Sequence, residues 1–426
     1  MKPHPPLAAF VSALFLLAST SSGRTAAGRL VTGADASAGG SHVKAFTTRT
    51  QTAAGSYFAY TPSFAGGVRV AAGDVNGDGG PDIVTGSGPG AAHVKVFAAG
   101  AWSEVRSFLP YGSGFSGGVF VATGDIDGDG HADIVTGVDE GAAPHVKVFS
   151  GATGTEIRSF FAYPIEFTGG VRVAAGDING DGLADIITGA GPGGGPHVKV
   201  FDGSTGAELK SFFAYDVSFS GGIYVGGGDV NGDGLADIIT GAGPGGGPHV
   251  KVFNGASQAE LHAFFAYDVG FQGGVRVAAG DVDGDGLAEI ITGAGPGGLP
   301  QVRVLDGVTL AQRASFLAYP DTFLDGVFVG VAAQFHPRLE TTFDRVEEAT
   351  LLHWPAGCLC ELEGNPKLGE REGWEPLRLE PVQNGNRFEV PLPTDLGTIF
   401  FRLNCDDEAL RQVLAGSGLV NRKSTF

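Results

Sequence analysis

The chain has 426 residues and a formal net charge of −19, with 46 acidic residues against 27 lysines and arginines. Such a balance argues against nucleic acid as a partner, because phosphate backbones attract basic surfaces. Hydrophobic residues make up 42% of the chain, enough for a packed core, and the 73 glycines favour strands and tight turns over helices. The length allows two to four ordinary domains, or one large repeat architecture with an extra domain.

Residues 1–23 have the pattern of a secretory signal peptide. A mildly basic start precedes an apolar run from Leu7 to Ala18, and small residues follow this run. A buried N-terminal strand is the alternative. The run is too short to span a bilayer, and no later stretch reaches about 18 apolar residues. We therefore expect a secreted or cell-surface protein without a transmembrane segment.

Residues 29–333 are organised as a repeat of 51 or 52 residues. Each repeat holds four segments rich in β-branched residues, separated by turns of Gly, Pro, Asn and Asp, which favours four strands. Typical segments, called A to D in chain order, are 275–279, 290–293, 197–201 and 209–215. Four short antiparallel strands at this interval are typical of the blades of a β-propeller.

Each of the four segment types occurs six times, but the chain enters the repeat at a B segment and leaves it at an A segment. The first B segment is 30–33 and the last A segment is 327–332. The B, C and D segments at the start lack an A segment, and the A segment at the end lacks the other three. Together these four segments make the sixth blade. The sequence therefore predicts an all-β, six-bladed β-propeller, closed by N-terminal strands B, C and D plus the C-terminal strand A.

An acidic nine-residue loop joins A to B in five of the six blades, and the interrupted sixth blade lacks it. In the copy that starts at Asp177, oxygen side chains occupy positions 1, 3, 5 and 9, and glycine occupies position 6. Hard cations such as Ca²⁺ take such oxygen ligands, together with a backbone carbonyl at position 7. A metal-free acidic turn is the alternative, but turn chemistry alone has no reason to repeat all these positions five times.

The sequence thus predicts calcium loops between two strands, with about five Ca²⁺ in total. The predicted metal-binding positions are Asp74, Asn76, Asp78, Gly80 and Asp82; Asp125, Asp127, Asp129, His131 and Asp133; Asp177, Asn179, Asp181, Leu183 and Asp185; Asp229, Asn231, Asp233, Leu235 and Asp237; and Asp281, Asp283, Asp285, Leu287 and Glu289.

Three recurring pieces of the repeat resemble the FG-GAP repeats of the integrin α type, also called VCBS-like repeats. These pieces are Phe-x-Gly-Gly before segment A, Gly-Asp-x-Asn/Asp-Gly-Asp-Gly in the loop, and Gly-Ala-Gly-Pro after segment B. The resemblance covers roughly residues 29–333, and it implies calcium bound between strands A and B of a propeller. Integrin heads have seven blades whereas this chain has six, so the resemblance does not carry integrin ligand recognition.

Two further positions recur in every blade. Five of the six C segments open with a histidine, namely His42, His93, His145, His197 and His249. One histidine per blade spreads over a wide ring, so we expect a structural role, such as a hydrogen bond to the adjacent Gly/Pro loop, and not a metal or catalytic cluster.

One position of segment A alternates Arg69, Phe120, Arg172, Tyr224, Arg276 and Phe328. We expect packing between blades there; the alternative is a ring that stacks sugars or binds carboxylates.

Residues 334–426 have less glycine, more charge and all three cysteines of the chain, Cys358, Cys360 and Cys405. Cys405 can pair with either of the other two in an oxidising compartment. Strand-like stretches at 349–355, 374–377, 387–393 and 398–403 resemble the small β-sandwich, fibronectin-III-like modules at the ends of some exported bacterial proteins. The resemblance implies an accessory or surface-attachment domain. Residues 406–415 are expected to form a short helix.

These observations favour a non-catalytic adhesion or ligand-binding protein of the cell surface or matrix, with an extracellular protein or glycan as partner. A lectin-like carbohydrate binder that uses the Arg and aromatic positions is one alternative. A polysaccharide-active enzyme on a propeller rim is another. Against an enzyme, the sequence has no Ser/His/Asp grouping, no zinc signature and no paired acids outside the loops.

Overall fold

We describe a computed structural model, which defines residues 29–36, 40–47, 51–98, 102–332 and the strands between 340 and 404. Contacts divide the chain into a unit of residues 27–335 and a second unit that holds the strands after residue 336. The predicted signal peptide, the three cysteines and the predicted helix at 406–415 lie outside the described residues. In the part of the chain that is described, no helix is long and apolar enough to cross a membrane.

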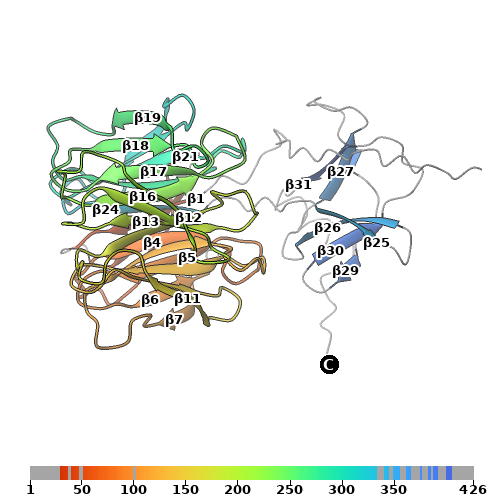
Figure 1. The fold of residues 1–426 in the computed structure, drawn as a ribbon, viewed down its shortest axis with the longest axis horizontal. Helices are drawn as coiled ribbons and strands as arrows, with labels where there is room; N and C mark the ends of the chain where they lie inside the picture. The colour runs from red at the N-terminus through yellow and green to blue at the C-terminus, as the bar shows by residue number, and fades with distance from the viewer. Residues whose placement is uncertain are drawn as a thin grey trace, which may run out of the picture. The chain divides into compact units, whose positions relative to one another are not determined.

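Residues 27–335 form six four-stranded antiparallel sheets, which are the blades of a propeller (Figure 1). Blade 1 holds β4 (Val68–Gly73), β5 (Asp82–Ser87), β6 (Val94–Phe97) and β7 (Glu104–Phe108). Blade 2 holds β8 (Val119–Gly124), β9 (Asp133–Val138), β10 (His145–Phe149) and β11 (Glu156–Phe161). Blade 3 holds β12 (Val171–Gly176), β13 (Asp185–Ala190), β14 (His197–Phe201) and β15 (Glu208–Phe213). Blade 4 holds β16 (Ile223–Gly228), β17 (Asp237–Ala242), β18 (His249–Phe253) and β19 (Glu260–Phe265). Blade 5 holds β20 (Val275–Gly280), β21 (Glu289–Ala294), β22 (Gln301–Leu305) and β23 (Gln312–Leu317).

The sixth blade is assembled from the two ends of the repeat region, as the count of segments predicts. It holds β24 (Val327–Ala332), β1 (Arg29–Ala34), β2 (His42–Thr47) and β3 (Ala53–Phe58), in that order. In the antiparallel pairing of β24 with β1, Val331 lies opposite Leu30 and Val329 opposite Thr32. This pairing closes the ring and leaves β1 paired on both sides, with β24 as the innermost strand of the blade.

In blades 1 to 5 the second strand is the most buried and the outermost strand the least. The innermost strands β4, β8, β12, β16, β20 and β24 contact one another in a closed ring. All six residues of β13 are buried, whereas in the outermost strand β15 exposed residues alternate with half-buried ones. The inner strands pack between two neighbouring blades, so both their faces are apolar; the outermost strand has one face to solvent, so its pattern has a period of two.

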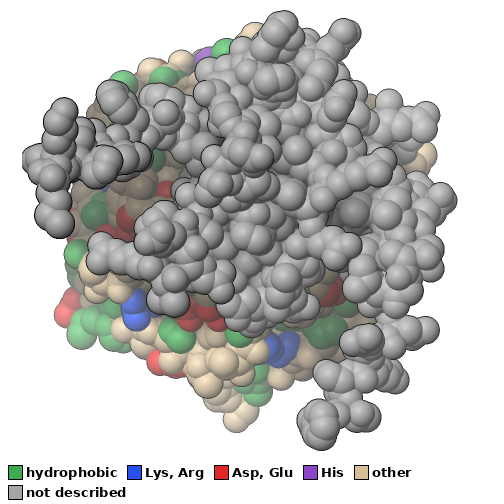
Figure 2. All heavy atoms as spheres, turned by 90° about the vertical axis from the view of Figure 1, so that its right-hand side faces the viewer, with side chains coloured by type: hydrophobic (Ala, Val, Ile, Leu, Met, Phe, Trp, Pro, Cys, Tyr) green, Lys and Arg blue, Asp and Glu red, His purple; other side chains and the backbone are tan. Residues whose placement is uncertain are grey.

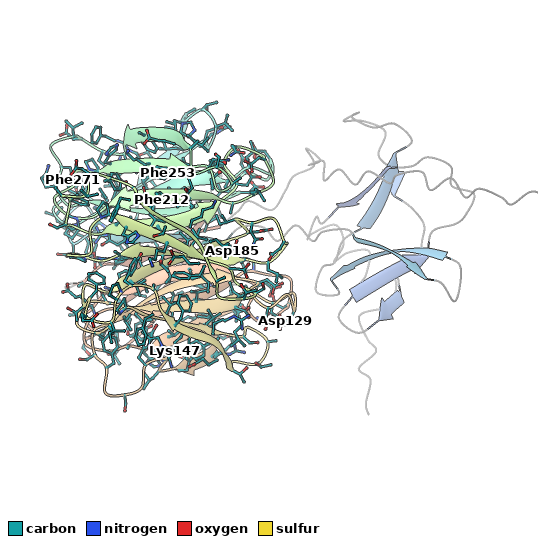
Figure 3. All side chains as sticks on the ribbon, viewed as in Figure 1. Asp129, Lys147, Asp185, Phe212, Phe253 and Phe271 are labelled. Atoms are coloured by element: carbon teal, nitrogen blue, oxygen red, sulfur yellow. The ribbon has the colours of Figure 1, made fainter. Side chains whose placement is uncertain are left out.

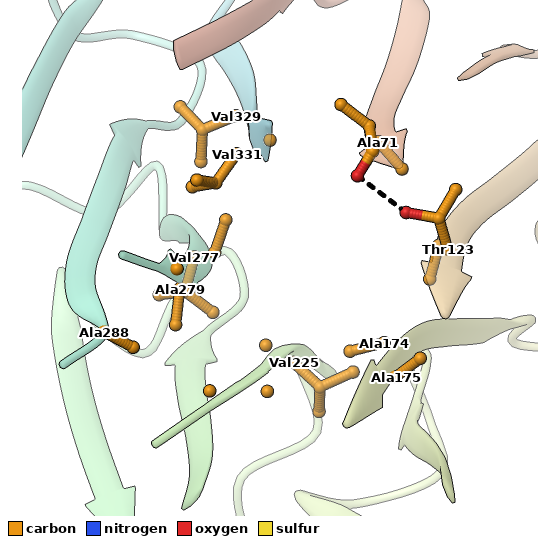
Figure 4. Close-up of a pocket in the computed structure, with 18 of the residues that line it drawn as sticks. Ala71, Thr123, Ala174, Ala175, Val225, Val277, Ala279, Ala288, Val329 and Val331 are labelled. Carbon is orange, nitrogen blue, oxygen red and sulfur yellow. Dashed lines mark hydrogen bonds between the residues drawn. The ribbon is translucent and has the colours of Figure 1, made fainter. Parts of the chain in front are cut away.

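A cavity of about 380 Å³ lies on the axis (Figure 4). It is lined mainly by Ala, Gly and Val residues of the six innermost strands, and Thr123 Oγ1 donates to the carbonyl of Ala72 at its wall (2.8 Å). The lining begins at Val70, one residue after Arg69, and extends to Asp229 and Asp281 at the other end of the innermost strands. The cavity therefore runs from the Arg/aromatic positions to the acidic loops.

The strands after residue 336 form two small sheets. One has the order β25 (Glu340–Asp344), β26 (Ala349–Pro355), β30 (Arg387–Pro391) and β29 (Val382–Asn384). The other has the order β28 (Glu375–Pro376), β27 (Glu361–Asn365) and β31 (Phe400–Asn404). Strands therefore occur where the sequence indicates them, and a sandwich-type accessory domain stays a prediction.

Candidate metal centres

The five acidic loops all join an innermost strand to the next strand of the same blade, and so lie at one end of the propeller. In Figure 3, Asp129 and Asp185 lie at the edge opposite to Phe271, which belongs to a connection between blades. Figure 2 shows Asp and Glu side chains among the visible propeller atoms of this face. The loops are positioned by the strands that they join, and position 9 is already the first residue of the second strand.

The third loop illustrates how these side chains are held. The Asp177 carboxylate accepts hydrogen bonds from the amides of Gly180 (2.7 Å) and Gly182 (2.9 Å), and both glycines have positive φ values, 82° and 89°. The Asp185 carboxylate accepts from the amide of Ile178 (2.9 Å). Only glycine adopts these positive φ values without steric cost, so the glycines at positions 4 and 6 allow the loop to turn sharply at both positions.

The carboxylates at position 9 are buried beneath the loops. Asp133, Asp185 and Asp237 are 0% exposed, and Asp82 and Glu289 are 1% exposed. Each accepts hydrogen bonds from backbone amides, such as those of Ile126 (2.8 Å) and Gly151 (2.8 Å) to Asp133. Amide donors leave the negative charge of a carboxylate in place, so a buried group of this kind favours a cation nearby.

Further carboxylates converge on these buried groups. In the second loop, ligand atoms of Asp125, Asp127 and Asp133 lie within 4.8 Å of one another. In the fifth loop, those of Asp281, Asp283 and Asp285 do the same. In the first, third and fourth loops, an asparagine occupies position 3, and its side-chain amide nitrogen donates to the position 9 carboxylate at 3.0–3.3 Å. The second and fifth loops therefore bring three carboxylates together, whereas in the other three loops an asparagine nitrogen contacts the position 9 carboxylate.

The pKa values of the position 9 carboxyl groups reflect this crowding. Burial, followed by the charges of Asp78 and Asp74, raises the pKa of Asp82 to about 7 despite two backbone hydrogen bonds. Burial and three neighbouring carboxylates raise the pKa of Glu289 to about 8. The same cause raises the pKa of Asp133 and that of Asp237 to about 6. Without a compensating cation, Asp82 and Glu289 therefore hold protons near neutral pH, and a divalent cation would replace those protons.

Consecutive loops are joined to one another, which sequence reasoning did not predict. The amide at position 8 donates to the carbonyl at position 1 of the preceding loop, as in Ala184 to Asp125 (2.8 Å) and Ala236 to Asp177 (2.7 Å). The side chain at position 7 covers the preceding loop: a β-carbon on Gly128 would lie 2.9 Å from Leu183 Cδ2. The repeated Ala-Asp/Glu at positions 8 and 9 was the only sequence signal for this contact.

The histidines of the C segments do not converge on a site. His145, for example, forms a hydrogen bond through Nε2 to Ser159 Oγ (2.8 Å), and its ring packs on that of Phe161 with centroids 4.6 Å apart. The structural role is confirmed, but the partner is a serine of the outermost strand and not the Gly/Pro loop. The reason is register: His145 lies directly opposite Phe161, and Ser159 lies two residues away on the same strand.

The Arg and aromatic positions of the innermost strands form one closed ring, which is called the Arg/aromatic ring below. Each guanidinium lies between two aromatic rings of neighbouring blades, with distances to the ring centroids of 5.0–5.3 Å. All members except the half-buried Tyr224 are at most 7% exposed. The expected packing between blades is therefore confirmed, and the faces of these aromatics are occupied by arginines, which leaves no face for a sugar.

Comparisons with known proteins identify the repeat. Residues 74–136 and 229–292 match the sequence profile of the FG-GAP-like repeat, and residues 169–207 match that of the FG-GAP repeat. Among solved structures, one described as an Agrocybe aegerita lectin that recognises non-reducing terminal N-acetylglucosamine is similar at 18% identity and a TM-score of 0.41, over 78% of this chain and 88% of the other.

Proposed function

From a six-bladed propeller that carries FG-GAP repeats, we propose an exported protein that binds about five Ca²⁺ ions and acts as a non-catalytic adhesion or ligand-binding protein at the cell surface or in the matrix. The observation that carries the calcium proposal is the recurrence, in five loops, of a carboxylate that is 0–1% exposed beneath other acidic side chains. Such a group is costly to leave uncompensated, and a hard divalent cation is its natural partner.

Calcium would act on the fold through the loops themselves. In each loop the backbone amides orient the carboxylates at positions 1 and 9, and the glycines at positions 4 and 6 let the chain curl around them. A bound cation would neutralise the mutual repulsion of these oxygens. Because consecutive loops share backbone hydrogen bonds, the ions would also hold neighbouring blades together.

Ligand binding is proposed for the opposite face, where the connections between blades lie. Phe161, Phe213 and Phe265 are 48–51% exposed although each packs on a histidine, with centroids 4.6–4.8 Å apart. The following connections expose the aliphatic residues Ile165, Val217 and Val269. Exposed apolar side chains that recur from blade to blade indicate an interaction surface for a repetitive partner, either a matrix protein or a glycan.

This surface also gives the lectin-like alternative its best support. A ring of Phe that is already held by a histidine loses little conformational freedom when a sugar packs on its free face. The buried Arg/aromatic ring is not available for such stacking. We therefore propose aromatic residues of the outermost strands, and not those of the innermost strands, for sugar binding. Near-identical blades offer equivalent sites and not one specialised site, which favours binding over catalysis.

Calorimetry and thermal unfolding test the calcium proposal. Titration of the metal-free protein should reveal about five binding sites. A Ca²⁺ concentration a hundred times Kd stabilises the native state by about 2.7 kcal/mol per site, so chelation should lower the melting temperature markedly and increase protease sensitivity. An unchanged melting curve in excess chelator would refute calcium as a structural ligand.

A glycan array and binding to matrix proteins test the ligand surface in saturating Ca²⁺. The triple variant Phe161→Ala, Phe213→Ala and Phe265→Ala should lose binding to whichever probe the native protein retains. Val308 is similarly exposed, at 49%, but lies in the turn between β22 and β23, and Val308→Ala is the matched control. If the triple variant binds as well as the control, the proposed surface is wrong even if calcium binding holds.

A further inference from the structure

Two of the three arginines of the Arg/aromatic ring are paired with an aspartate of the next blade, and the third has no such partner among the described residues. Arg69 Nη2 donates to Asp139, and Arg276 Nη2 donates to Asp35; both pairs are buried ion pairs. No carboxylate of the described residues forms an ion pair with Arg172, although Arg172 is only 7% exposed. In the described part of the chain, Nε and Nη1 are buried without a hydrogen-bond partner in Arg172 and in the paired Arg276 alike. The two arginines therefore differ at Nη2, which donates to the aspartate in Arg276 and has no such carboxylate in Arg172.

Gly243 occupies the position at which blades 2 and 6 have the aspartate that pairs with the arginine. Asp35, Asp139 and Gly243 each follow the second strand of blades 6, 2 and 4, directly after β1, β9 and β17. Their backbone amides make equivalent hydrogen bonds to the carbonyls of Gly326 (3.1 Å), Gly118 (3.1 Å) and Gly222 (2.9 Å). The three positions are therefore equivalent in the fold, and only the side chain differs.

The missing charge matters because the guanidinium is confined. Arg172 lies between Phe120 and Tyr224, at 5.3 Å and 5.2 Å from the ring centroids, as the paired arginines lie between their aromatics. An arginine stays protonated in proteins, so it cannot escape the cost of burial by losing its charge. The aromatic faces compensate part of that charge, but the in-plane donors still require an acceptor.

We propose that the Arg172 guanidinium, at the position left open by Gly243, is a binding site for the carboxylate of a solute or ligand. The molecule itself shows the preferred occupant of this position twice, since Asp139 and Asp35 place a carboxylate against Arg69 and Arg276. Those two side chains keep 10% and 12% of their surface exposed, so the position opens to solvent. The half-buried Tyr224 is the one aromatic of the ring that carries a hydroxyl, and the Arg172 guanidinium lies over its ring.

The carboxylate can be a free small ion or part of a larger molecule, such as a uronic acid. Both sources share the planar two-oxygen group that a guanidinium binds through parallel hydrogen bonds. The site lies at the end of the innermost strands opposite to the calcium loops and needs no metal. The inference therefore stands or falls independently of the proposed calcium binding.

Bromide is the first probe, because the propeller contains its own controls. Crystals of the native protein soaked in bromide should show an anomalous peak at Arg172 and none at Arg69 or Arg276, whose carboxylate partners exclude an anion. Equal peaks at all three arginines, or no peak at Arg172, would overturn the proposal.

Acetate and glucuronate are the second probes, titrated at constant ionic strength in saturating Ca²⁺. The native protein should show a saturable rise in melting temperature with either carboxylate, and Arg172→Gln should lose this rise. Arg106→Gln, which removes a half-buried arginine that bonds the carbonyl of Ser150, should keep it. An equal response of native protein and Arg172→Gln contradicts the site. Tighter binding of glucuronate than of acetate identifies a ligand carboxylate, whereas equal affinity identifies a free ion.

The substitution Gly243→Asp tests whether a carboxylate of the protein itself can fill the site beside Arg172. A β-carbon at Gly243 would lie 2.1 Å from the carbonyl oxygen of Gly221, so the backbone must shift to accept it. If this variant folds, the acetate response should disappear and the bromide peak with it. If it does not fold, the Arg172→Gln comparison still decides the question.

Discussion

The hydroxyl of Tyr319 donates a hydrogen bond of 2.8 Å to the carbonyl of His42, a residue 277 positions earlier in the chain. Tyr319 follows the last strand of blade 5, and His42 begins the third strand of blade 6. The equivalent tyrosines Tyr60, Tyr111, Tyr163, Tyr215 and Tyr267 make the same contact with the following blade, at 2.6–3.0 Å. Six such bonds connect all blades, and the Tyr319 bond connects the two ends of the repeat region.

Tyr319→Phe should reduce the free energy of unfolding by about 1–3 kcal/mol, because it leaves the partly buried carbonyl of His42 without this donor. Tyr57 is the matched control: its Oη atom is buried without a hydrogen-bond partner, so Tyr57→Phe should be neutral or stabilising. Denaturant unfolding of both variants in saturating Ca²⁺ measures the difference. Equal losses of stability would show that ring packing, and not the hydrogen bond, accounts for the effect.

Closure of the ring by β24 can be tested by shortening the chain. A chain that ends at Asp325 loses β24 and the later residues but keeps all five acidic loops, whereas a chain that ends at Pro337 keeps β24. Without β24, the edge of β1 is unpaired and the Arg/aromatic ring lacks Phe328. The longer chain should be soluble and unfold cooperatively, and the shorter one should aggregate or unfold at lower temperature even in excess Ca²⁺. Identical melting curves would show that this strand is dispensable.

The stabilisation by Ca²⁺ should increase with pH. The pKa of Asp82 is about 7 and that of Glu289 about 8 in the folded, metal-free protein, against ordinary values of 3.8 and 4.5. A carboxyl group whose pKa is raised by folding stabilises the fold below its ordinary pKa, and this contribution is lost as the pH rises through the raised pKa. The metal-free protein should therefore become less stable between about pH 4 and about pH 8, where Ca²⁺ compensates the newly formed charges.

The measurement is the difference in melting temperature with and without Ca²⁺, at about pH 5.5 and about pH 8. Glu289→Gln should flatten the pH dependence of the metal-free protein, because the amide at position 9 no longer titrates. A gain in melting temperature that is the same at both pH values would contradict this account of the loops.

Neighbouring loops should influence one another. Asp181→Ala removes the position 5 side chain of the third loop, which is joined by backbone hydrogen bonds to the second and the fourth loops. Calorimetric stoichiometry should fall from five to four, and the remaining sites should bind more weakly, by a few-fold. Asp285→Ala makes the same change in the fifth loop, which adjoins the interrupted sixth blade, so its effect on the remaining affinities should be smaller.

Equal affinities of the four remaining sites in the two variants would mean that the loops are independent despite their shared hydrogen bonds. Loss of all binding in either variant would mean that the five loops act as one cooperative unit.

The repeat, its four strands per blade and the split sixth blade could be predicted from the sequence alone, because they depend on local rules. Alternating β-branched residues specify strands, Gly and Pro specify turns, and a fixed spacing of Asp, Asn and Gly specifies the loops. Counting the segments was enough to pair 327–332 with 30–33, since an open ring would leave strand edges unpaired.

Only the tertiary structure decided which side chains meet between blades. The Tyr319–His42 bond, the loop-to-loop amide bonds and the pairing of Arg69 with Asp139 all join residues of different blades. These contacts depend on how each sheet is twisted and packed against the next, and no local pattern encodes that arrangement. The sequence by itself determined the blades and their candidate metal ligands, whereas packing around the closed ring decided which charges are compensated.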